Sequence, residues 1–405
     1  MIEPLNVAFI HPDLGHGGAE RLVVDAALHL QSAGHRVTIF TAHHDPARCF
    51  EETRDGTLRV RVHGDGLPAH IGQRLRVPCV IARMAWVAAA MARRAGPFDL
   101  IVCDGVAHII PLLRALSRAP IVLYGHFPDL LLSPPRRGWY RWYRAPIDWL
   151  EAVTTVKADR VLVNSRFTAA VFRETFARYP TLQPEVLYPG VDPERYATVP
   201  PLALDAEAAT VLSLCRYDAS KNVSLAIDAL AALRERHPAE FARARLVVAG
   251  GYDERLRENR QTLDTLQARV RDRQLDERVV FLRSVSEVER LRLLAECTCV
   301  VYTPAREHFG YVPVEAMAAG RPVVAVDAGG PAETVRHGAT GWLCPPTPVA
   351  FAEALAHLLA DAAMARRMGE AGREHVRTHF SRAAFGARLD AAVRAVLATP
   401  QRRPR

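Results

Sequence analysis

Thirteen short runs rich in valine, isoleucine and leucine constrain the fold of this 405-residue chain more than any other feature. Seven runs precede residue 191: LNVAFI, VTIFTA, LRVRVH, FDLIVCD, PIVLYGH, RVLVNS and EVLYPG. Six follow it: TVLSLCR, ARLVVAG, RVVFLR, CVVYTP, RPVVAVD and GWLC. Near-continuous apolar strands that alternate with helices are typical of parallel sheets covered on both faces. Two such series predict an α/β protein with two doubly wound domains.

The length of the chain agrees with two domains, because 405 residues exceed what one hydrophobic core usually supports. We predict the first domain over residues 1–190 and the second over residues 210–397. Residues 191–209 are rich in proline and alanine and lack a clear period, which is typical of a linker. Residues 398–405 are predicted to form a flexible tail.

The basic side chains are almost all arginine. Of 52 basic residues, lysine occurs only at positions 157 and 221. The net charge is +8, and residues 66–98 hold five arginines and no acid. A basic excess this local predicts an anionic partner.

Cysteine usage and the start of the sequence indicate a cytoplasmic protein. The seven cysteines show no C-x-x-C spacing, which predicts reduced thiols. The first residues, MIEPLNVAFIHPD, contain neither a basic segment nor an apolar signal segment, so we expect no cleaved signal peptide.

Two loops of the first domain follow strands, and ligands bind at the carboxyl ends of strands in open parallel sheets. A glycine turn, HPDLGHGGAERLVV, leads into a helix, but Glu20 occupies the last glycine position of G-x-G-x-x-G and excludes a dinucleotide fingerprint. Gly17 and Gly18 would still let a phosphate approach the backbone, although a plain connector is equally compatible. His126 ends the fifth strand and has either a structural or a catalytic role.

The eighth strand runs into CRYDASKN, which holds Arg216 and Lys221. A guanidinium fork together with a compact ammonium suits a diphosphate. Both residues could instead be surface cations, but this chain uses arginine for nearly all its other cations. We therefore predict that Lys221 meets a chemical requirement, because a slim ammonium can sit between the oxygens of a diphosphate.

The strongest signal follows CVVYTP, in REHFGYVPVEAMAAGRPVV. Glu307 and Glu315 lie eight residues apart, and Pro313 suits the first turn of a helix that runs to Gly320. The helix start would offer amides to an anion while the two carboxylates accept hydrogen bonds from hydroxyls. A sugar nucleotide needs both kinds of contact.

These segments carry a family resemblance. E-x7-E after an R-x4-K-N segment and a glycine turn resembles the retaining glycosyltransferases of family 4, which have the GT-B fold of two facing Rossmann-like domains. HFPDLLL, RAPIDWLE, ADRVLVNSRFTAAVF, VLYPGVD and REHFGYVPVEAM extend the likeness over nearly the whole chain. They resemble the mannosyltransferases of that family that extend a lipid-linked oligosaccharide.

The resemblance implies roles for individual residues. The donor would be GDP-mannose, with Arg216 and Lys221 on its diphosphate, Glu315 on its ribose and Glu307 beside the transferred sugar. The remaining implied contacts face the donor or the same cleft: Phe309, Gly310, Tyr311, Val312, Gly17, Gly18 and His126. One departure is Ser220, which stands where the family often has a second lysine.

The resemblance also implies the reaction. Mannose would be transferred with retention, in α-1,3 or α-1,6 linkage, to a lipid-linked glycan. We favour front-face attack in which the leaving phosphate helps to deprotonate the acceptor. No D-x-D motif follows a strand, so we expect no divalent metal and no other cofactor. We also expect no nucleic-acid partner.

Two segments predict peripheral attachment to an anionic membrane, on its cytoplasmic face. Residues 77–92 are apolar but interrupted by Arg83, so they are too short to span a bilayer, and Arg83 would share a stripe with Arg94. A helix packed against the sheet is the alternative for this segment. On a membrane, the apolar surface around the stripe would come from Ile81, Trp86, Val87 and Met91. The second segment, SPPRRGWYRWYRAP, mixes aromatic and basic residues as headgroup-level segments do. Its key residues are Trp139, Trp142, Tyr140, Tyr143, Arg136, Arg137, Arg141 and Arg144.

Three alternatives stay open. Another nucleotide sugar or a soluble acceptor would fit the same family. A sugar-nucleotide binder without catalysis would fit the same fold. A metal-dependent hydrolase could use a set of residues on the loops after the first two strands, although no known ligand spacing supports it. That set is His11, Asp13, His16, His43, His44 and Asp45.

Overall fold

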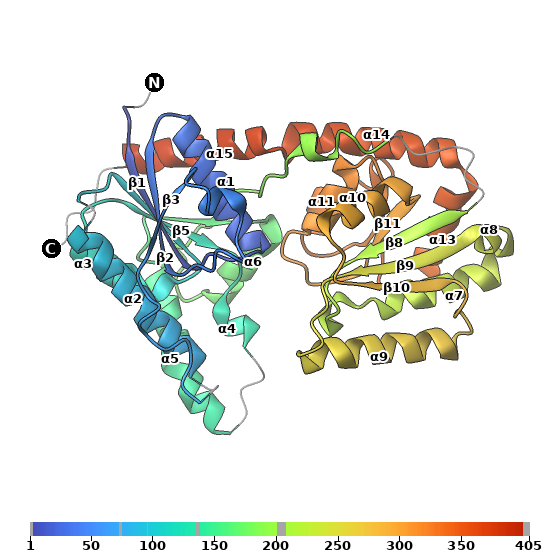
Figure 1. Cartoon of the computed structure of the whole chain (residues 1–405), viewed down its shortest axis with the longest axis horizontal. Coiled ribbons are helices and arrows are strands. Elements are labelled where there is room, and N and C mark those ends of the chain that lie inside the picture. The colour runs from blue at the N-terminus through green and yellow to red at the C-terminus, as the bar shows by residue number, and fades with distance from the viewer. Residues whose placement is uncertain (1–2, 73–74, 95, 134–137, 201–207, 400–405) are drawn as a thin grey trace. The chain divides into compact units, whose positions relative to one another are not determined.

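The computed structural model describes residues 3–72, 75–94, 96–133, 138–200 and 208–399. The chain divides into two compact units (Figure 1). The first unit contains the described residues up to Gly190 together with those from Phe385 onward, and the second runs from Val191 to Ala384.

The first unit is built on a seven-stranded parallel sheet in the order β3-β2-β1-β4-β5-β6-β7. Its strands are β1 (Asn6–Asp13), β2 (Arg36–His43), β3 (Arg59–Val62), β4 (Leu100–Asp104), β5 (Ile121–Gly125), β6 (Arg160–Val163) and β7 (Glu185–Val186). All seven coincide with the predicted runs. The order reverses beside β1, so the carboxyl ends of β1 and β4 meet at the switch point where such sheets bind ligands.

Helices cover both faces of this sheet because successive strand residues point to opposite sides. Val7 and Phe9 of β1 belong to the core under α1 and α15, whereas Ala8 and Ile10 belong to the core under α2, α3 and α6. The helices of this unit are α1 (Gly18–Ser32), α2 (Arg76–Arg94), α3 (Ile110–Leu116), α4 (Asp129–Leu132), α5 (Trp139–Thr155), α6 (Arg166–Thr175) and most of α15 (Arg382–Ala398).

The second unit has a six-stranded parallel sheet in the order β10-β9-β8-β11-β12-β13. Its strands are β8 (Ala209–Leu214), β9 (Ala244–Gly250), β10 (Val279–Arg283), β11 (Cys299–Tyr302), β12 (Val323–Val326) and β13 (Gly341–Cys344). The six predicted runs account for all of them. In this sheet the switch point lies between β8 and β11, whose following loops hold Lys221 and Glu307.

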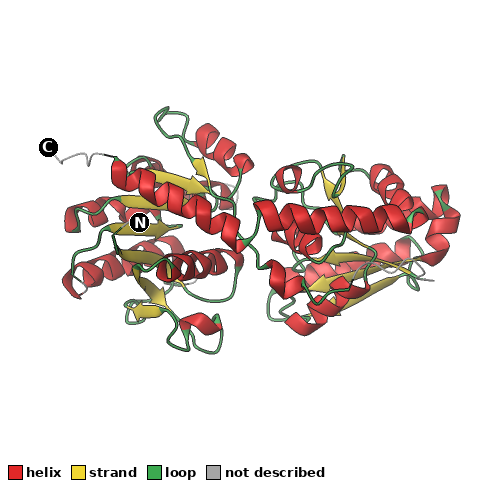
Figure 2. Cartoon of the chain, turned by 90° about the horizontal axis from the view of Figure 1, so that it is seen from above, coloured by secondary structure: helices red, strands yellow, loops and turns green. Residues whose placement is uncertain are grey.

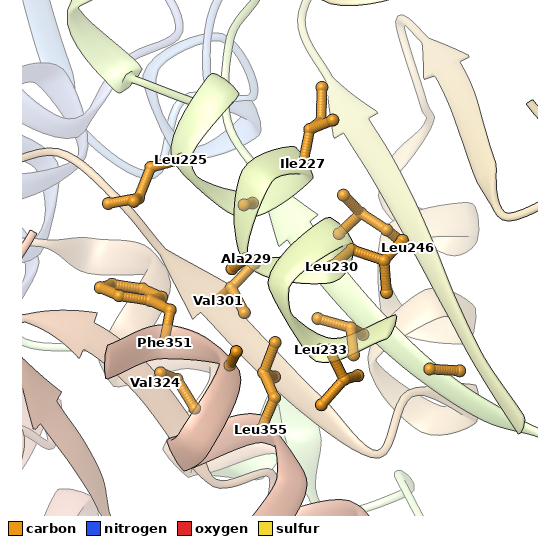
Figure 3. Close-up of a cluster of buried hydrophobic side chains, with 14 of the residues drawn as sticks. Leu225, Ile227, Ala229, Leu230, Leu233, Leu246, Val301, Val324, Phe351 and Leu355 are labelled. Carbon is orange, nitrogen blue, oxygen red and sulfur yellow. The ribbon is translucent and has the colours of Figure 1, made fainter. Parts of the chain in front are cut away.

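Figure 2 shows helices flanking the strands in each unit. In the second unit, α7 and α13 bury Leu230 and Phe351 against strand residues such as Val301 (Figure 3). The helices here are α7 (Ser224–Arg236), α8 (Pro238–Arg243), α9 (Arg257–Asp272), α10 (Glu287–Glu296), α11 (Tyr311–Ala318), α12 (Pro331–Thr334), α13 (Pro348–Ala360) and α14 (Ala362–His379).

The predicted linker, residues 191–209, belongs to the second unit wherever it is described. The amide of Val191 donates to the Phe380 carbonyl at 2.8 Å, and the amide of Arg382 donates to the Val191 carbonyl at 2.9 Å. Asp192 also accepts from the Arg382 side chain at 3.0 Å. Backbone pairing therefore holds this segment in place, which its Pro- and Ala-rich composition does not indicate.

The predicted end of the second domain at residue 397 is wrong. The last helix, α15, groups with the first unit from Phe385 onward. Its apolar residues lie in the core beneath α1, and the buried ones are Phe385, Leu389, Val393 and Val396. A helix has to bury its apolar stripe, and sequence pattern alone does not say against which sheet.

Within the described residues, no single helix has both the length and the apolar composition to cross a membrane. The helices α13 and α14 meet those criteria only as a pair, and they are bent by 102° at the break between them.

Candidate functional site

Lys221 is held rigidly after β8. It ends a short 3-10 turn, Ala219–Lys221, which Asp218 caps by accepting from the Ser220 amide at 2.8 Å. Asn222 then adopts a left-handed conformation, with φ of 48°, and redirects the chain into α7. The Thr303 hydroxyl donates to the Lys221 carbonyl at 2.7 Å and ties this turn to the end of β11.

The Lys221 ammonium pairs directly with Glu307. Its Nζ lies 2.6 Å from Glu307 Oε2, and the Tyr302 hydroxyl donates to the same oxygen at 2.6 Å. Lys221 and Glu307 are each 18% exposed, so both are within reach of a ligand. Burial raises the pKa of the Glu307 carboxyl, but Lys221 and Tyr302 outweigh it and hold that pKa below its usual value. The carboxylate is therefore ionised at neutral pH.

A second glycine turn, in DAGGPAE, supports the Glu307 loop. The Gly330 amide donates to the Glu307 carbonyl at 2.8 Å. A Cβ on Gly330 would lie 2.3 Å from the Phe309 carbonyl oxygen, and Gly329 has a left-handed φ of 63°. Only glycine allows backbone to approach backbone this closely.

The helix α11 starts as predicted, directly after this loop. Gly310 is its N-cap, with φ of 84°, and Tyr311 and Val312 form its first turn. Amides of a first turn have no partner inside their helix, so this helix start suits an anion. The Phe309 ring is buried against Phe380, which leaves a contact with the donor to its backbone.

Glu315 lies on α11 in a two-pronged ion pair with Arg290 of α10. The Arg290 guanidinium donates to Glu315 Oε2 at 2.6 Å and to Oε1 at 2.8 Å, and it also contacts the Tyr196 hydroxyl at 2.9 Å. Burial lowers the pKa of Arg290, but Glu315 outweighs it and raises that pKa further above its usual value. The guanidinium fixes the orientation of the predicted ribose carboxylate, whose other lone pairs can still accept from hydroxyls.

Arg216 is more exposed and less tightly paired than Lys221, Glu307 and Glu315. Its side chain is 74% exposed and lies 3.7 Å from Asp218, its nearest carboxylate partner. A loosely paired, solvated guanidinium can reach toward an anionic ligand at little cost.

The glycine turn of the first unit leads into α1, as predicted. Gly17 is the N-cap in an extended conformation, and Gly18 is the first helical residue. A Cβ on Gly17 would lie 2.2 Å from Glu20 Oε2, so the Glu20 side chain folds back against this backbone.

His126 belongs to a chain of hydrogen-bonded side chains at the carboxyl ends of β1, β4 and β5. Its Nε2 lies 2.9 Å from Asp104 Oδ1, while Asp104 Oδ2 lies 2.7 Å from His11 Nδ1. Burial lowers the pKa of His11, but its bonds to Asp104 and Glu20 outweigh it and raise that pKa to about 10. Burial likewise raises the pKa of Asp104, yet His126 and His11 bring it well below its usual range.

The structure contradicts part of the predicted membrane surface. Arg83 is wrong as a surface cation, because its guanidinium donates to the Gly64 and Ala42 carbonyls at 3.0 and 2.9 Å. Arg144 is wrong too, since it is 1% exposed and paired with Asp129 at 2.7 Å. Buried arginines of this kind satisfy backbone and carboxylate groups that would otherwise have no partner.

Other predicted membrane residues are exposed. Trp142 is 81% exposed, and Arg94 is exposed at the end of α2. Val87 and Met91 of α2, which were expected to supply apolar surface, lie in the core instead. The side chain of Trp139 and residues 136 and 137 lie outside the described part of the chain.

The histidines proposed for a metal-dependent hydrolase are engaged separately. His43 pairs with Asp65 at 2.6 Å, and His44 contacts the Thr53 hydroxyl at 3.0 Å. In the part of the chain that the structure describes, no three His, Cys, Asp or Glu side chains gather as metal ligands would. The hydrolase alternative therefore receives no support.

Sequence reasoning missed four residues of these sites: Asp104, Arg290, Tyr196 and Tyr302. Asp104 and Tyr302 each end a strand, so the rule that strand ends carry ligand contacts would have found them. Arg290 and Tyr196 carry no such signal, because a helix surface and a proline-rich segment bring them to Glu315.

Two family models match the chain. The model described as "Glycosyltransferase Family 4" covers residues 16–195, and the one described as "Glycosyl transferases group 1" covers residues 197–375. Among solved structures, sucrose-phosphate synthase from Thermosynechococcus elongatus superposes with a TM-score of 0.78 at 24% identity, covering 97% of this chain and 99% of that one. Anabaena HepE in complex with UDP and glucose gives 0.70 at 22% identity, covering 96% and 100%. These likenesses confirm the GT-B fold.

Similar sequences indicate a narrower family than the solved structures do. "Alpha-1,3/1,6-mannosyltransferase ALG2" of Homo sapiens is 46% identical over 394 residues, which cover 95% of this chain and 94% of that protein. The proteins of the same name from Mus musculus and Rhizomucor pusillus are 44% and 42% identical, covering 95% and 96% of this chain and 94% and 91% of theirs. The chain is thus an enzyme, and it belongs to the α-1,3/1,6-mannosyltransferase family of GT-B glycosyltransferases.

Proposed function

We propose that this protein transfers mannose from GDP-mannose to a lipid-linked glycan with retention of configuration, in α-1,3 or α-1,6 linkage. The observation that carries the proposal is the contact of 2.6 Å between Lys221 and Glu307, the two loop residues that the family resemblance assigns to the diphosphate and the transferred sugar. Each is partly exposed and follows a strand at the switch point of the second sheet. The names of the relatives support mannose as the sugar.

Each charged residue then has a role in the reaction. Arg216 and Lys221 bind the diphosphate, the first amides of α11 assist them, and Glu315 accepts from the ribose hydroxyls. In the absence of donor Lys221 neutralises Glu307, and on donor binding it turns to the phosphate oxygens. Glu307 is then left to accept from hydroxyls of the mannose.

Charge that develops on the leaving phosphate is the main cost of this transfer. A preorganised ammonium beside that phosphate lowers the barrier without any rearrangement during the reaction. The phosphate oxygen accepts the proton of the attacking hydroxyl on the same face of the sugar, which yields retention. The family resemblance also assigns Gly17, Gly18 and His126 of the first unit to substrate contacts.

Apolar side chains on α5 support a membrane-facing surface, which differs in part from the one expected. Trp142 and Trp149 lie seven residues apart, or about two helical turns, and are 81% and 63% exposed. Leu131 and Leu132 of α4 are also exposed, and Arg141 adds a cation. Exposed tryptophan beside arginine is typical of the headgroup level, which supports attachment to a membrane surface. We keep the cytoplasmic face as part of the proposal.

Vesicle flotation tests this surface. We expect binding to vesicles that contain phosphatidylserine, weaker binding in high salt, and loss of binding when Trp142 and Trp149 are both changed to Ala. Val288→Ala, which alters an exposed apolar residue of the second unit, serves as the matched control. Equal recovery of the double variant and the wild type would remove α5 from the proposal.

The proposed reaction is tested by mass spectrometry of products. Purified protein is incubated with a lipid-linked glycan and, in parallel, with GDP-mannose or UDP-glucose. We expect one or two added hexoses with GDP-mannose only. Addition from UDP-glucose, or addition to a water-soluble glycan at an equal rate, would favour the corresponding alternative within the family.

A further inference from the structure

The buried His11 side chain has a protonation state that its neighbours dictate. Its Nδ1 lies 2.7 Å from a carboxylate oxygen of Asp104, and its Nε2 lies 2.9 Å from the carbonyl oxygen of Asp13. A carbonyl oxygen can only accept, and so can an ionised carboxylate. Both ring nitrogens of His11 must therefore carry hydrogen, which makes this residue an imidazolium. The Glu20 carboxylate, 3.9 Å from Nε2, adds a second negative neighbour.

Asp104 passes this constraint on to His126. Its side chain is 2% exposed and uses one oxygen for His11 and the other for His126 Nε2, at 2.9 Å. Because the carboxylate only accepts, His126 Nε2 must donate. The neutral imidazole of His126 then carries its lone pair on Nδ1, which has no hydrogen-bond partner among the described residues.

Further contacts fix the orientation of His126. The Asn164 side chain donates to its carbonyl at 3.3 Å, and the Tyr124 ring lies against its ring with centroids 5.0 Å apart. The imidazole of His126 is 27% exposed, whereas the His11 and Asp104 side chains are almost completely buried. Two charged groups thus lie behind a single ring that reaches the surface of the first unit.

We propose that His11 and Asp104 are positioning residues, which form a buried charged pair that holds His126 in the Nε2–H tautomer with a bare Nδ1. A bare nitrogen accepts hydrogen bonds and repels phosphate oxygens, so it selects a hydroxyl of a sugar substrate. This assignment rests on the proposed function for the identity of the substrate, but not for the tautomer.

The tautomer can be measured without any substrate. Protein labelled with ¹⁵N-histidine gives different nitrogen shifts for protonated and bare ring nitrogens, and His126→Gln and His11→Gln identify the two signals among the 16 histidines. At about pH 8.5, where an ordinary imidazole is neutral, we expect a protonated Nε2 and a bare Nδ1 for His126. We expect both nitrogens of His11 to be protonated. A protonated Nδ1 on His126, or a neutral His11, would overturn the proposal.

Asp104→Asn then tests the consequence for catalysis. The amide keeps the shape of the aspartate and can accept from His11, but its NH₂ group faces His126 Nε2 and favours the opposite tautomer, which changes the acceptor into a donor. We expect the His126 nitrogen signals to exchange and kcat/KM for mannosyl transfer to fall about tenfold or more. The affinity for GDP, which lacks the sugar, should stay at the wild-type value.

Asp390→Asn is the matched control, because Asp390 pairs with His29 at 3.0 Å in the same unit and has no hydrogen bond to His126 or Asp104 among the described residues. It should leave both the tautomer and kcat/KM unchanged. An Asp104→Asn enzyme that equals wild type in kcat/KM, or one whose GDP affinity falls in step, would contradict the positioning role. If no nucleotide sugar is turned over while the wild-type tautomer is as expected, the proposed function fails and the assignment of the tautomer stands.

Discussion

The charged side chains at the candidate sites of the two units differ in how deeply they are buried. In the first unit, the His11–Asp104 pair is almost fully buried and satisfied by protein groups on every side. In the second, Lys221 pairs with Glu307 and Arg290 with Glu315 through side chains that are partly exposed, and Arg216 is mostly solvated. Both sets lie at the carboxyl ends of parallel strands or in the elements that follow them.

This difference in burial indicates which charged side chains can exchange an ion pair within the protein for a contact with a ligand. Breaking a buried pair costs about 3 to 5 kcal/mol, because one charge is left without water or a partner. The pairs of the second unit are partly exposed, so water or a phosphate of the donor can replace either partner at a lower cost. We infer that the second unit exchanges its internal ion pairs for contacts with the donor, while the buried pair of the first unit keeps a fixed geometry.

Replacing Lys221 should have the largest effect on activity. We expect Lys221→Ala to lower kcat about 100-fold or more, the effect of losing one preorganised donor to a developing charge. Lys221→Arg should recover little, because a wider guanidinium would crowd the Tyr302 hydroxyl, which donates to the same Glu307 oxygen as the Lys221 ammonium. Lys157→Ala, at the exposed second lysine of the chain, is the matched control in the same steady-state assay. Near-full activity of the arginine variant would refute the argument from size.

The buried His11–Asp104 pair should affect the stability of the protein and its dependence on pH. The pKa of His11 is raised to about 10 in the folded protein, so its contribution is complete below about pH 6.5 and is lost as the pH rises through about 10. Because of this residue, we expect the free energy of unfolding to fall by about 2 kcal/mol from about pH 7 to about pH 9. Denaturant titrations of the wild type and His11→Gln measure it.

The variant should lack that part of the pH dependence, whereas His29→Gln, which removes the more exposed pair with Asp390, should retain it. Parallel pH profiles for the wild type and His11→Gln would show that His11 does not hold its charge over this range.

Substitutions of Glu315 and Glu307 should change different kinetic constants. Glu315→Gln should mainly raise the donor KM, by about tenfold, because a ribose contact is equally strong in the ground and transition states. Glu307→Gln should mainly lower kcat by a similar factor. Glu353→Gln changes a partly exposed, arginine-paired glutamate of the same unit and should behave like wild type. The reverse pattern in steady-state kinetics would exchange the two roles.

The smallest expected effect concerns metal. If Arg216, Lys221 and the start of α11 neutralise the diphosphate, activity should be unchanged within a factor of about two after treatment with EDTA. Activity that disappears with EDTA and returns with Mn²⁺ would mean that a cation, and not the exchangeable side chains, holds the leaving group.

The sequence predicted the sheets well because buried parallel strands are nearly continuous apolar runs, and all thirteen were identified. Lys221, Glu307 and Glu315 were found because they follow strands or open a helix in a recognisable spacing. The partners Arg290 and Asp104 were missed, since contacts between distant segments decide them. Likewise, no local pattern tells a buried arginine such as Arg144 from an exposed one.

A crystal structure of the protein with GDP tests the central claim most directly. We expect Lys221 Nζ to leave Glu307 and to lie within hydrogen-bond distance of a phosphate oxygen, while the distances within the His11–Asp104 pair stay as they are. A diphosphate bound elsewhere, with the Lys221–Glu307 contact of 2.6 Å intact, would contradict it.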